Sequence, residues 1–210
     1  MFSKDHLKKA LALKEFDAIR AQNMMTPRPR ESVRPPEKKG SPNQGAVMLL
    51  LYNKNHKLNI LLEKRQDNLS YHPGQVSFPG GKHEYKEAFL ETALRETYEE
   101  IGIDPDNLEI LGNLNPVYIP PSDFVVYPFA SWHNSQPVCT PCHDEVAEII
   151  EVSVNELLKK SSKSSEMRII NDSEITVPYF MIKEHKVWGA TAMILSELLE
   201  RFKCTGIKDQ

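Results

Sequence analysis

Three glutamates stand close together near the middle of the chain, within the run Arg95-Glu-Thr-Tyr-Glu-Glu100. Residues three and four positions apart share one face of an α-helix, so Glu96, Glu99 and Glu100 are expected to converge if the run is helical. Carboxylates held together repel one another and favour a counter-ion. Hard divalent cations such as Mg²⁺ take oxygen ligands and commonly bridge to substrate phosphates. The run therefore predicts a metal site, with a solvated helix face as the alternative.

The spacing around these glutamates follows a fixed pattern. Gly81 is followed after five residues by Glu87, Glu87 is followed after seven by Arg95, and Gly102 closes the acidic run. This pattern resembles the Nudix box, G-x5-E-x7-R-E-U-x-E-E-x-G-U, where U is a bulky aliphatic residue; only Thr97 departs from it. The resemblance implies an α/β fold, the Nudix α/β/α sandwich over a mixed β-sheet. It also implies a phosphoric-anhydride hydrolase that depends on Mg²⁺ or Mn²⁺.

The resemblance also implies a role for each residue of the pattern. The metal ligands that it implies are Glu96, Glu99, Glu100 and the backbone carbonyl of Gly80. The catalytic residues from the box are Glu99, Arg95 and Glu87. Arg95 and Glu87 lie eight positions apart, about two helical turns, so their side chains can meet in an ion pair that orients the site.

A general base is expected from outside the box, because Nudix enzymes often draw an additional glutamate from elsewhere in the chain. Glu145 and Glu148 lead into a predicted strand after a loop. We expect Glu145 to be the base, with Glu148 as the alternative. Both side chains are also consistent with solvated charges at the edge of a strand.

A second motif lies directly before the box, from Leu61 to Gly81. It resembles the signature of the coenzyme A pyrophosphatase branch of the Nudix hydrolases, L-L-T-x-R-[SA]-x3-R-x3-G-x3-F-P-G-G. The matching residues expected to contribute to substrate binding are Arg65, Gly74, Phe78 and Gly81. The departures are Glu63 for the threonine, Gln66 for the small residue and Ser70 for the second arginine. Arginine is a usual bidentate partner of phosphate, so Ser70 bears most on substrate choice.

A third segment near the C-terminal end is similar to one typical of the same branch. It consists of Val177-Pro-Tyr-Phe180 and Val187-Trp-Gly-Ala-Thr-Ala192. Ordinary core packing is the expected role of Tyr179 and Trp188 themselves. The three resemblances together cover roughly residues 45 to 200.

The function implied by these resemblances is hydrolysis of coenzyme A or an acyl derivative. The products would be 4′-phosphopantetheine, or its acyl form, and adenosine 3′,5′-bisphosphate. The departures leave open another nucleoside diphosphate derivative, such as ADP-ribose or a dinucleotide polyphosphate. A nucleotide-sensing module without catalysis is a further alternative, which the intact set of Glu96, Glu99 and Glu100 disfavours.

The composition limits the partners that we expect. The net charge of −3 gives no reason to expect nucleic acid, so the predicted partner is a small nucleotide. No apolar run approaches the about 20 residues of a membrane span, and the charged N-terminus lacks the apolar core of a signal peptide. A cytosolic (cytoplasmic) protein is therefore expected. The N-terminal segment is a candidate for a homodimer contact, although nothing in its sequence pattern requires one.

The three cysteines do not indicate a disulfide framework, because their number is odd. Cys139-Thr-Pro-Cys142-His143 spells C-x-x-C-H, the string used for attachment of c-type haem. A zinc half-site is the other reading, and it would need two more ligands, for which Cys204 and His133 are candidates. We expect a plain loop with exposed thiols.

Periodicity predicts the order of the elements. Residues 1–44 are expected to hold an N-terminal helix over residues 2–22 and an extended, basic, proline-rich arm from Thr26 to Gly45. Residues 45–205 are expected to form the Nudix domain that the resemblance implies. Strands are predicted at 46–52, 58–62, 124–129, 146–152 and 174–182, and helices within 81–103 and at 154–160 and 191–202. Residues 161–172 are predicted to form a polar loop.

Overall fold

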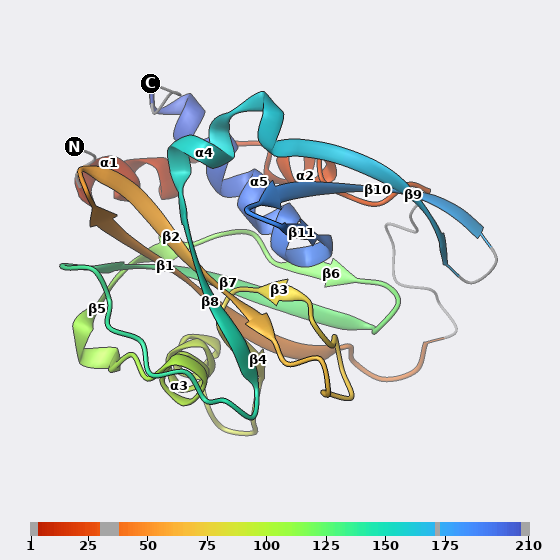
Figure 1. The fold of residues 1–210 in the computed structure, drawn as a ribbon, viewed down its shortest axis with the longest axis horizontal. Helices are drawn as coiled ribbons and strands as arrows, with labels where there is room; N and C mark the ends of the chain where they lie inside the picture. Colours follow the sequence, from red (N-terminus) through yellow and green to blue (C-terminus); the bar gives the residue numbers. More distant parts are fainter. Residues whose placement is uncertain (1–3, 30–37, 171–172, 207–210) are drawn as a thin grey trace.

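A mixed β-sheet forms the centre of the computed structural model, which describes residues 4–29, 38–170 and 173–206 (Figure 1). The strand order is β3-β2-β1-β7-β5, and β4, β6 and β8 pair with β1, β7 and β2. The long strands β1 and β7 run parallel, whereas the other pairs are antiparallel. The strand bounds are β1 Asn43–Lys54, β2 Lys57–Arg65, β3 Val76–Ser77, β4 Gly80–Lys82, β5 Leu108–Asn113, β6 Val117–Ile119, β7 Phe124–His133 and β8 Val146–Ser153.

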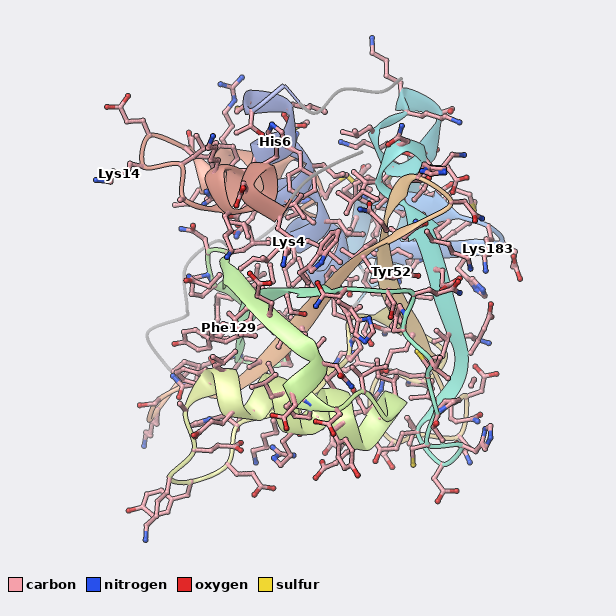
Figure 2. The ribbon with its side chains drawn as sticks, turned by 90° about the vertical axis from the view of Figure 1, so that its left-hand side faces the viewer. Lys4, His6, Lys14, Tyr52, Phe129 and Lys183 are labelled. Atoms are coloured by element: carbon pink, nitrogen blue, oxygen red, sulfur yellow. The ribbon has the colours of Figure 1, made fainter. Side chains whose placement is uncertain are left out.

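Helices cover both faces of this sheet, as Figures 1 and 2 show. One face carries α3 (Phe89–Ile101), and the other carries α5 (Gly189–Cys204) with α1 (Lys4–Leu11), α2 (Ala18–Asn23) and α4 (Val154–Leu158). Strand β1 is buried on both faces because Met48 and Leu50 pack on the α3 side, whereas Leu49 and Leu51 pack on the α5 side. The expected α/β/α sandwich is confirmed.

The strands predicted at 46–52 and 58–62 are present as a β-hairpin, and both are longer than predicted. Strands β1 and β2 pair in register from Leu51 with Ile60 to Lys54 with Lys57. Asn55 and His56 make the turn with positive φ angles of 51° and 62°. The strands predicted at 124–129, 146–152 and 174–182 and the helix predicted at 191–202 are also present, each within longer bounds.

The single helix predicted over residues 2–22 is wrong in the part of it that the structure describes. The chain forms α1 and α2 instead, because the Asp17 carboxylate accepts a 2.9 Å hydrogen bond from the Arg20 amide and begins a new helix there. Leu7 and Leu11 of α1 enter the core on the α5 side. Residues 30–37 of the predicted arm lie outside the described residues, and β1 already begins at Asn43.

The loop predicted at residues 161–172 is also wrong. A short 3-10 helix (η2, Lys160–Ser162) leads into β9 (Lys163–Ile170), which pairs with β10 (Ser173–Ile182). Strand β11 (His185–Trp188) completes this second, three-stranded sheet. Polar residues such as Ser164 and Glu166 occupy β9 because pairing with β10 satisfies its backbone. Residues 171 and 172 lie outside the described residues.

The helix predicted at 154–160 ends two residues early, at Leu158. Its predicted start is confirmed, since the Ser153 hydroxyl oxygen accepts a 3.2 Å hydrogen bond from the Glu156 amide. A further 3-10 turn, η1 (Pro105–Asn107), connects α3 to β5. In the part of the chain that the structure describes, no helix has both the length and the apolar character to cross a membrane.

Candidate active site

Helix α3 carries the acidic run and rests on the sheet through an apolar stripe. Ala93, Thr97 and Ile101 are buried at four-residue spacing, whereas Glu99 is exposed, Glu96 is partly buried and Glu100 is buried. The Thr97 hydroxyl donates a 2.6 Å hydrogen bond to the carbonyl of Ala93, which explains how a polar residue occupies the aliphatic position of the box. Gly102 ends the helix with a φ of 71°, as a left-handed cap.

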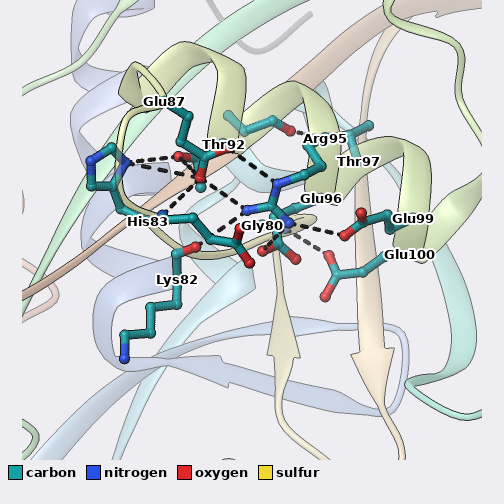
Figure 3. A network of polar contacts seen from close by, with 12 residues as sticks. Gly80, Lys82, His83, Glu87, Thr92, Arg95, Glu96, Thr97, Glu99 and Glu100 are labelled. Carbon is teal, nitrogen blue, oxygen red and sulfur yellow. Dashed lines mark hydrogen bonds and ion pairs between the residues drawn. The ribbon is translucent and has the colours of Figure 1, made fainter.

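Arg95 lies at the centre of a network of carboxylates (Figure 3). Its Nε and Nη2 donate to the two oxygens of Glu87 at 3.2 and 3.0 Å. Its Nη1 donates to Glu96 at 2.9 Å and to Glu99 at 3.0 Å. The hydrogen bonds from Arg95 hold the pKa of Glu87 down at about 2. The guanidinium therefore ties the start of α3 to two glutamates of the acidic run.

Glu100 turns away from this network toward the sheet. Its Oε2 accepts a 2.7 Å hydrogen bond from the Gly80 amide, and its Oε1 lies 3.3 Å from Nη1 of Arg65 on β2. The Glu100 side chain is almost fully buried. Burial raises the pKa of its carboxyl group, and the nearby charge of Glu63 raises it further. Burial likewise raises the pKa of Glu96.

The two glycines before the box bring backbone into contact with these carboxylates. A Cβ on Gly81 would lie 2.4 Å from the Glu96 carboxylate, so only a glycine lets that side chain lie where it does. A Cβ on Gly80 would lie 2.3 Å from the Ala46 carbonyl oxygen, and the φ of Gly80 is 153°. Strand β4 is thus held between β1 and α3, with its Gly80 amide pointing at Glu100.

Glu63 lies on the strand that also carries Arg65, and the sequence indicated it only as a departure from a motif. It lies on β2 with no exposed surface, and neither carboxylate oxygen has a hydrogen-bond partner among the described residues. Burial raises the pKa of Glu63, and the charges of Glu145 and Glu96 add to this rise. The charge of Arg65 counteracts this rise, and Ser77 on β3 does so less, although its contact with Glu63 does not reach hydrogen-bond geometry. The sequence signal that could have placed Glu63 is the alternation of side chains along β2, which puts Glu63 and Arg65 on the same face of the strand.

The two candidates for the general base lie in different surroundings. Glu145 is exposed at the start of β8, and its charge acts on both Glu63 and Glu96. The Gln66 amide donates a 2.8 Å hydrogen bond to the carbonyl of Glu145, which holds this loop beside β2. Glu148 instead lies 3.0 Å from Nε2 of His185 on β11. The sequence reasoning missed the role of Gln66 in holding this loop.

The site presents carboxylate oxygens, the donors that a hard divalent cation such as Mg²⁺ or Mn²⁺ prefers. The buried oxygens of Glu63, which lack a partner among the described residues, fit a cation near them. The box glutamates do not form a tight cluster, because Arg95 lies between Glu96 and Glu99. Among the described residues, the one group whose ligand atoms all lie within 4.8 Å is Glu148, Glu184 and His185.

The residues expected to bind substrate are distributed over the loop between β2 and β4. Arg65 is the one that reaches the acidic run. Gly74 has a φ of 64°, and a Cβ there would lie 2.4 Å from Oδ1 of Asp67, so it shapes the loop. Phe78 is only 1% exposed and packs in the core on the α5 side, where it has almost no surface to offer a ligand.

The Cys139–Cys142 loop supports the end of α3. The Thr140 amide donates a 2.8 Å hydrogen bond to the carbonyl of Ile101, and the Cys142 amide donates one of the same length to the carbonyl of Glu100. The thiols of Cys139 and Cys142 are partly buried rather than exposed as expected, and burial raises the pKa of Cys139 to about 11. Within the described ranges, neither cysteine belongs to a group with metal-binding geometry.

The fold and the site together define an α/β protein with a carboxylate-rich helix next to a glycine-rich strand. Residues 42–172 match the model of the NUDIX domain family. Nudix hydrolase 3 of Caenorhabditis elegans is 31% identical over 170 residues, covering 73% of this chain and 71% of that protein. An uncharacterized Nudix hydrolase NudL of Photorhabdus laumondii is 32% identical, covering 80% of this chain and 89% of that protein. The chain belongs to the Nudix hydrolase family.

Solved structures support the same fold. A C. elegans Ap4A hydrolase binary complex has a TM-score of 0.53 at 16% identity, covering 77% of this chain and 96% of that one. A MutT protein from Methanosarcina mazei Go1 has a TM-score of 0.52 at 18% identity, covering 81% of this chain and all of that one. At these identities the likeness extends to the fold and not to the substrate.

Proposed function

We propose that this Nudix hydrolase cleaves the pyrophosphate of coenzyme A or of an acyl derivative, with Mg²⁺ or Mn²⁺ as its cofactor. The products are 4′-phosphopantetheine, or its acyl form, and adenosine 3′,5′-bisphosphate. The observation that carries the choice of substrate is the pair of segments, 61–81 and 177–192, that resemble the coenzyme A pyrophosphatase branch. Strand β11 of the second segment contacts β3 of the first, so both contribute to one region of the fold (Figure 1).

The contacts support separate roles for the site residues. Glu96, Glu99, Glu100 and the Gly80 carbonyl would hold the cation, which when bound would neutralise phosphate oxygens and make a water molecule more acidic. Arg95 positions Glu96 and Glu99 through its hydrogen bonds, and Glu87 fixes the guanidinium.

Glu145 acts as the general base in this proposal. It takes a proton from the attacking water while the water oxygen bonds to one phosphorus and the bridging P–O bond breaks. Two phosphate monoesters result, so the atoms of water are divided between them. The exposure of Glu145 and the action of its charge on Glu63 and Glu96 support this role.

A second candidate substrate is another nucleoside diphosphate derivative, such as ADP-ribose or a dinucleotide polyphosphate. Three residues favour it, since Glu63, Gln66 and Ser70 depart from the signature of the coenzyme A branch. Ser70 stands where the signature has an arginine that would pair with a phosphate. A substrate whose phosphates are arranged differently would not need an arginine at this position.

A substrate panel separates the two candidates. Purified protein is incubated with Mg²⁺ or Mn²⁺ and coenzyme A, ADP-ribose, NADH or diadenosine polyphosphates, and the products are resolved by chromatography. We expect the highest kcat/KM for coenzyme A or its acyl derivatives, and almost complete loss of turnover in Glu99→Gln. A preference for ADP-ribose would overturn the coenzyme A proposal, and cleavage of none of these compounds would overturn the enzymatic one.

A further inference from the structure

Strand β2 directs a carboxylate from the sheet toward the acidic helix. Leu61 packs on the α3 side of the sheet, whereas Leu62 packs on the α5 side. Alternation along the strand therefore places Glu63 and Arg65 on the α3 side. The Arg65–Glu100 contact of 3.3 Å agrees with this assignment. Glu63 lies between two paired strands, opposite Ser77 of β3 and Ile149 of β8, and it has no exposed surface.

The Glu63 carboxylate is buried without a hydrogen-bond partner among the described residues. Neither oxygen accepts a hydrogen bond from any residue that the structure describes. The opposing charge that acts on Glu63 is that of Arg65, whose Nη1 contacts Glu100. An ionised carboxylate buried in this way is strongly unfavourable without a proton or a cation.

A shared proton is the less suitable solution here. Two carboxyl groups that share a proton must lie within hydrogen-bond distance of each other. The described hydrogen bonds of Glu100 are with Gly80 and Arg65 and not with Glu63. The charges of Glu100, Glu96 and Glu145 nevertheless act on Glu63. Glu63 therefore adds a carboxyl group to a region that already holds those of Glu96, Glu100 and Glu145, and whose guanidinium groups are bound to other carboxylates.

We infer that Glu63 is a further carboxylate ligand of the divalent cation, supplied by the sheet and additional to the set from the box. This inference rests on the proposed function, because it concerns the same cation. Mg²⁺ keeps several water ligands, so Glu63 binds the cation directly or through one of these waters. The extra charge strengthens cation binding at a position where the related signature has a neutral threonine.

The test measures Mn²⁺ binding to the full-length protein by electron paramagnetic resonance, without substrate. Glu63→Gln keeps the shape of the side chain and removes its charge, and Glu63→Thr restores the residue of the signature. We expect both variants to bind Mn²⁺ at least about tenfold more weakly than the wild type. Glu109→Gln is the matched control, since Glu109 pairs with Lys4 and Lys8 away from the site; it should bind Mn²⁺ as the wild type does.

Folding is controlled by thermal unfolding in the presence of a chelator. Removal of an uncompensated buried charge should leave Glu63→Gln at least as stable as the wild type at pH 8. Equal Mn²⁺ affinity and stoichiometry in the wild type and both variants would overturn the inference. Wild-type protein that binds no Mn²⁺ would instead overturn the cation-dependent function itself, so the two failures are distinguishable.

Discussion

Arg95 donates hydrogen bonds to three carboxylates and to one backbone carbonyl, that of Lys82. The contact between Arg95 and Glu87 was predicted from their spacing, and it forms although Glu87 lies before α3, which begins at Phe89. Sequence alone could not place Glu63, since its burial depends on β3 and β8, which reach β2 from distant parts of the chain. The contact between Arg95 and Glu87 was therefore predictable from their spacing, whereas the burial of Glu63, which depends on pairing between strands, was not.

The general base is tested by a matched pair of substitutions at the residue scale. Glu145→Gln should lower kcat by about 10² to 10⁴, because general-base catalysis typically contributes that factor. Glu148→Gln should change kcat little, since Glu148 is hydrogen-bonded to His185. Steady-state kinetics of both variants at saturating Mg²⁺ gives the answer. Near-normal turnover in Glu145→Gln would rule out this assignment.

Among the elements, those with a strong local pattern were predictable. The apolar run of β1, the β1–β2 hairpin and the glycine-capped end of α3 all follow from periodicity and turn residues. The break between α1 and α2 was missed because the apolar face of residues 2–22 is weak and Asp17 can cap a new helix. Strand β9 was missed because its polar composition resembles a loop until β10 pairs with it.

Strand β4 gives a prediction that separates site geometry from stability. Gly81→Ala should fold with a near-normal Tm but lose most of its activity, because the new Cβ meets the end of the movable Glu96 side chain. Gly80→Ala should be destabilised by at least about 1–3 kcal/mol, because its Cβ meets the backbone of β1 and its φ is positive. Thermal unfolding and turnover of both variants test this. Equal Tm losses would contradict the distinction.

Helix α1 gives a prediction of pH dependence. Hydrogen bonds from Lys4 and Lys8 hold the pKa of Glu109 down at about 2, so this contact stabilises the docked helix above the ordinary carboxyl pKa of 4.5. The stabilisation should be lost as the pH falls from 4.5 through about 2. Hydrogen exchange of the α1 amides measures it.

Glu109→Gln is the control for this pH dependence. The variant should exchange its α1 amides faster than the wild type near neutral pH and similarly to it near pH 2. Equal protection of α1 in the two proteins at neutral pH would show that Glu109 does not hold the helix.

At the scale of the whole molecule, the sandwich of helices around a mixed sheet followed from the resemblance to the Nudix hydrolases. The second sheet did not, because its strands depend on the placement of β10 next to β9 and β11. This sheet brings the C-terminal segment against β3 and places His185 beside Glu148. The proposed substrate region therefore combines parts of the chain that are more than a hundred residues apart.

The most direct test of the account is a ³¹P nuclear magnetic resonance spectrum of coenzyme A incubated with the protein and Mg²⁺. We predict that the pyrophosphate resonances disappear as two phosphate monoester resonances appear, that the 3′-phosphate resonance remains, and that a chelator stops the change. Pyrophosphate resonances that persist with folded protein and Mg²⁺ would contradict the account.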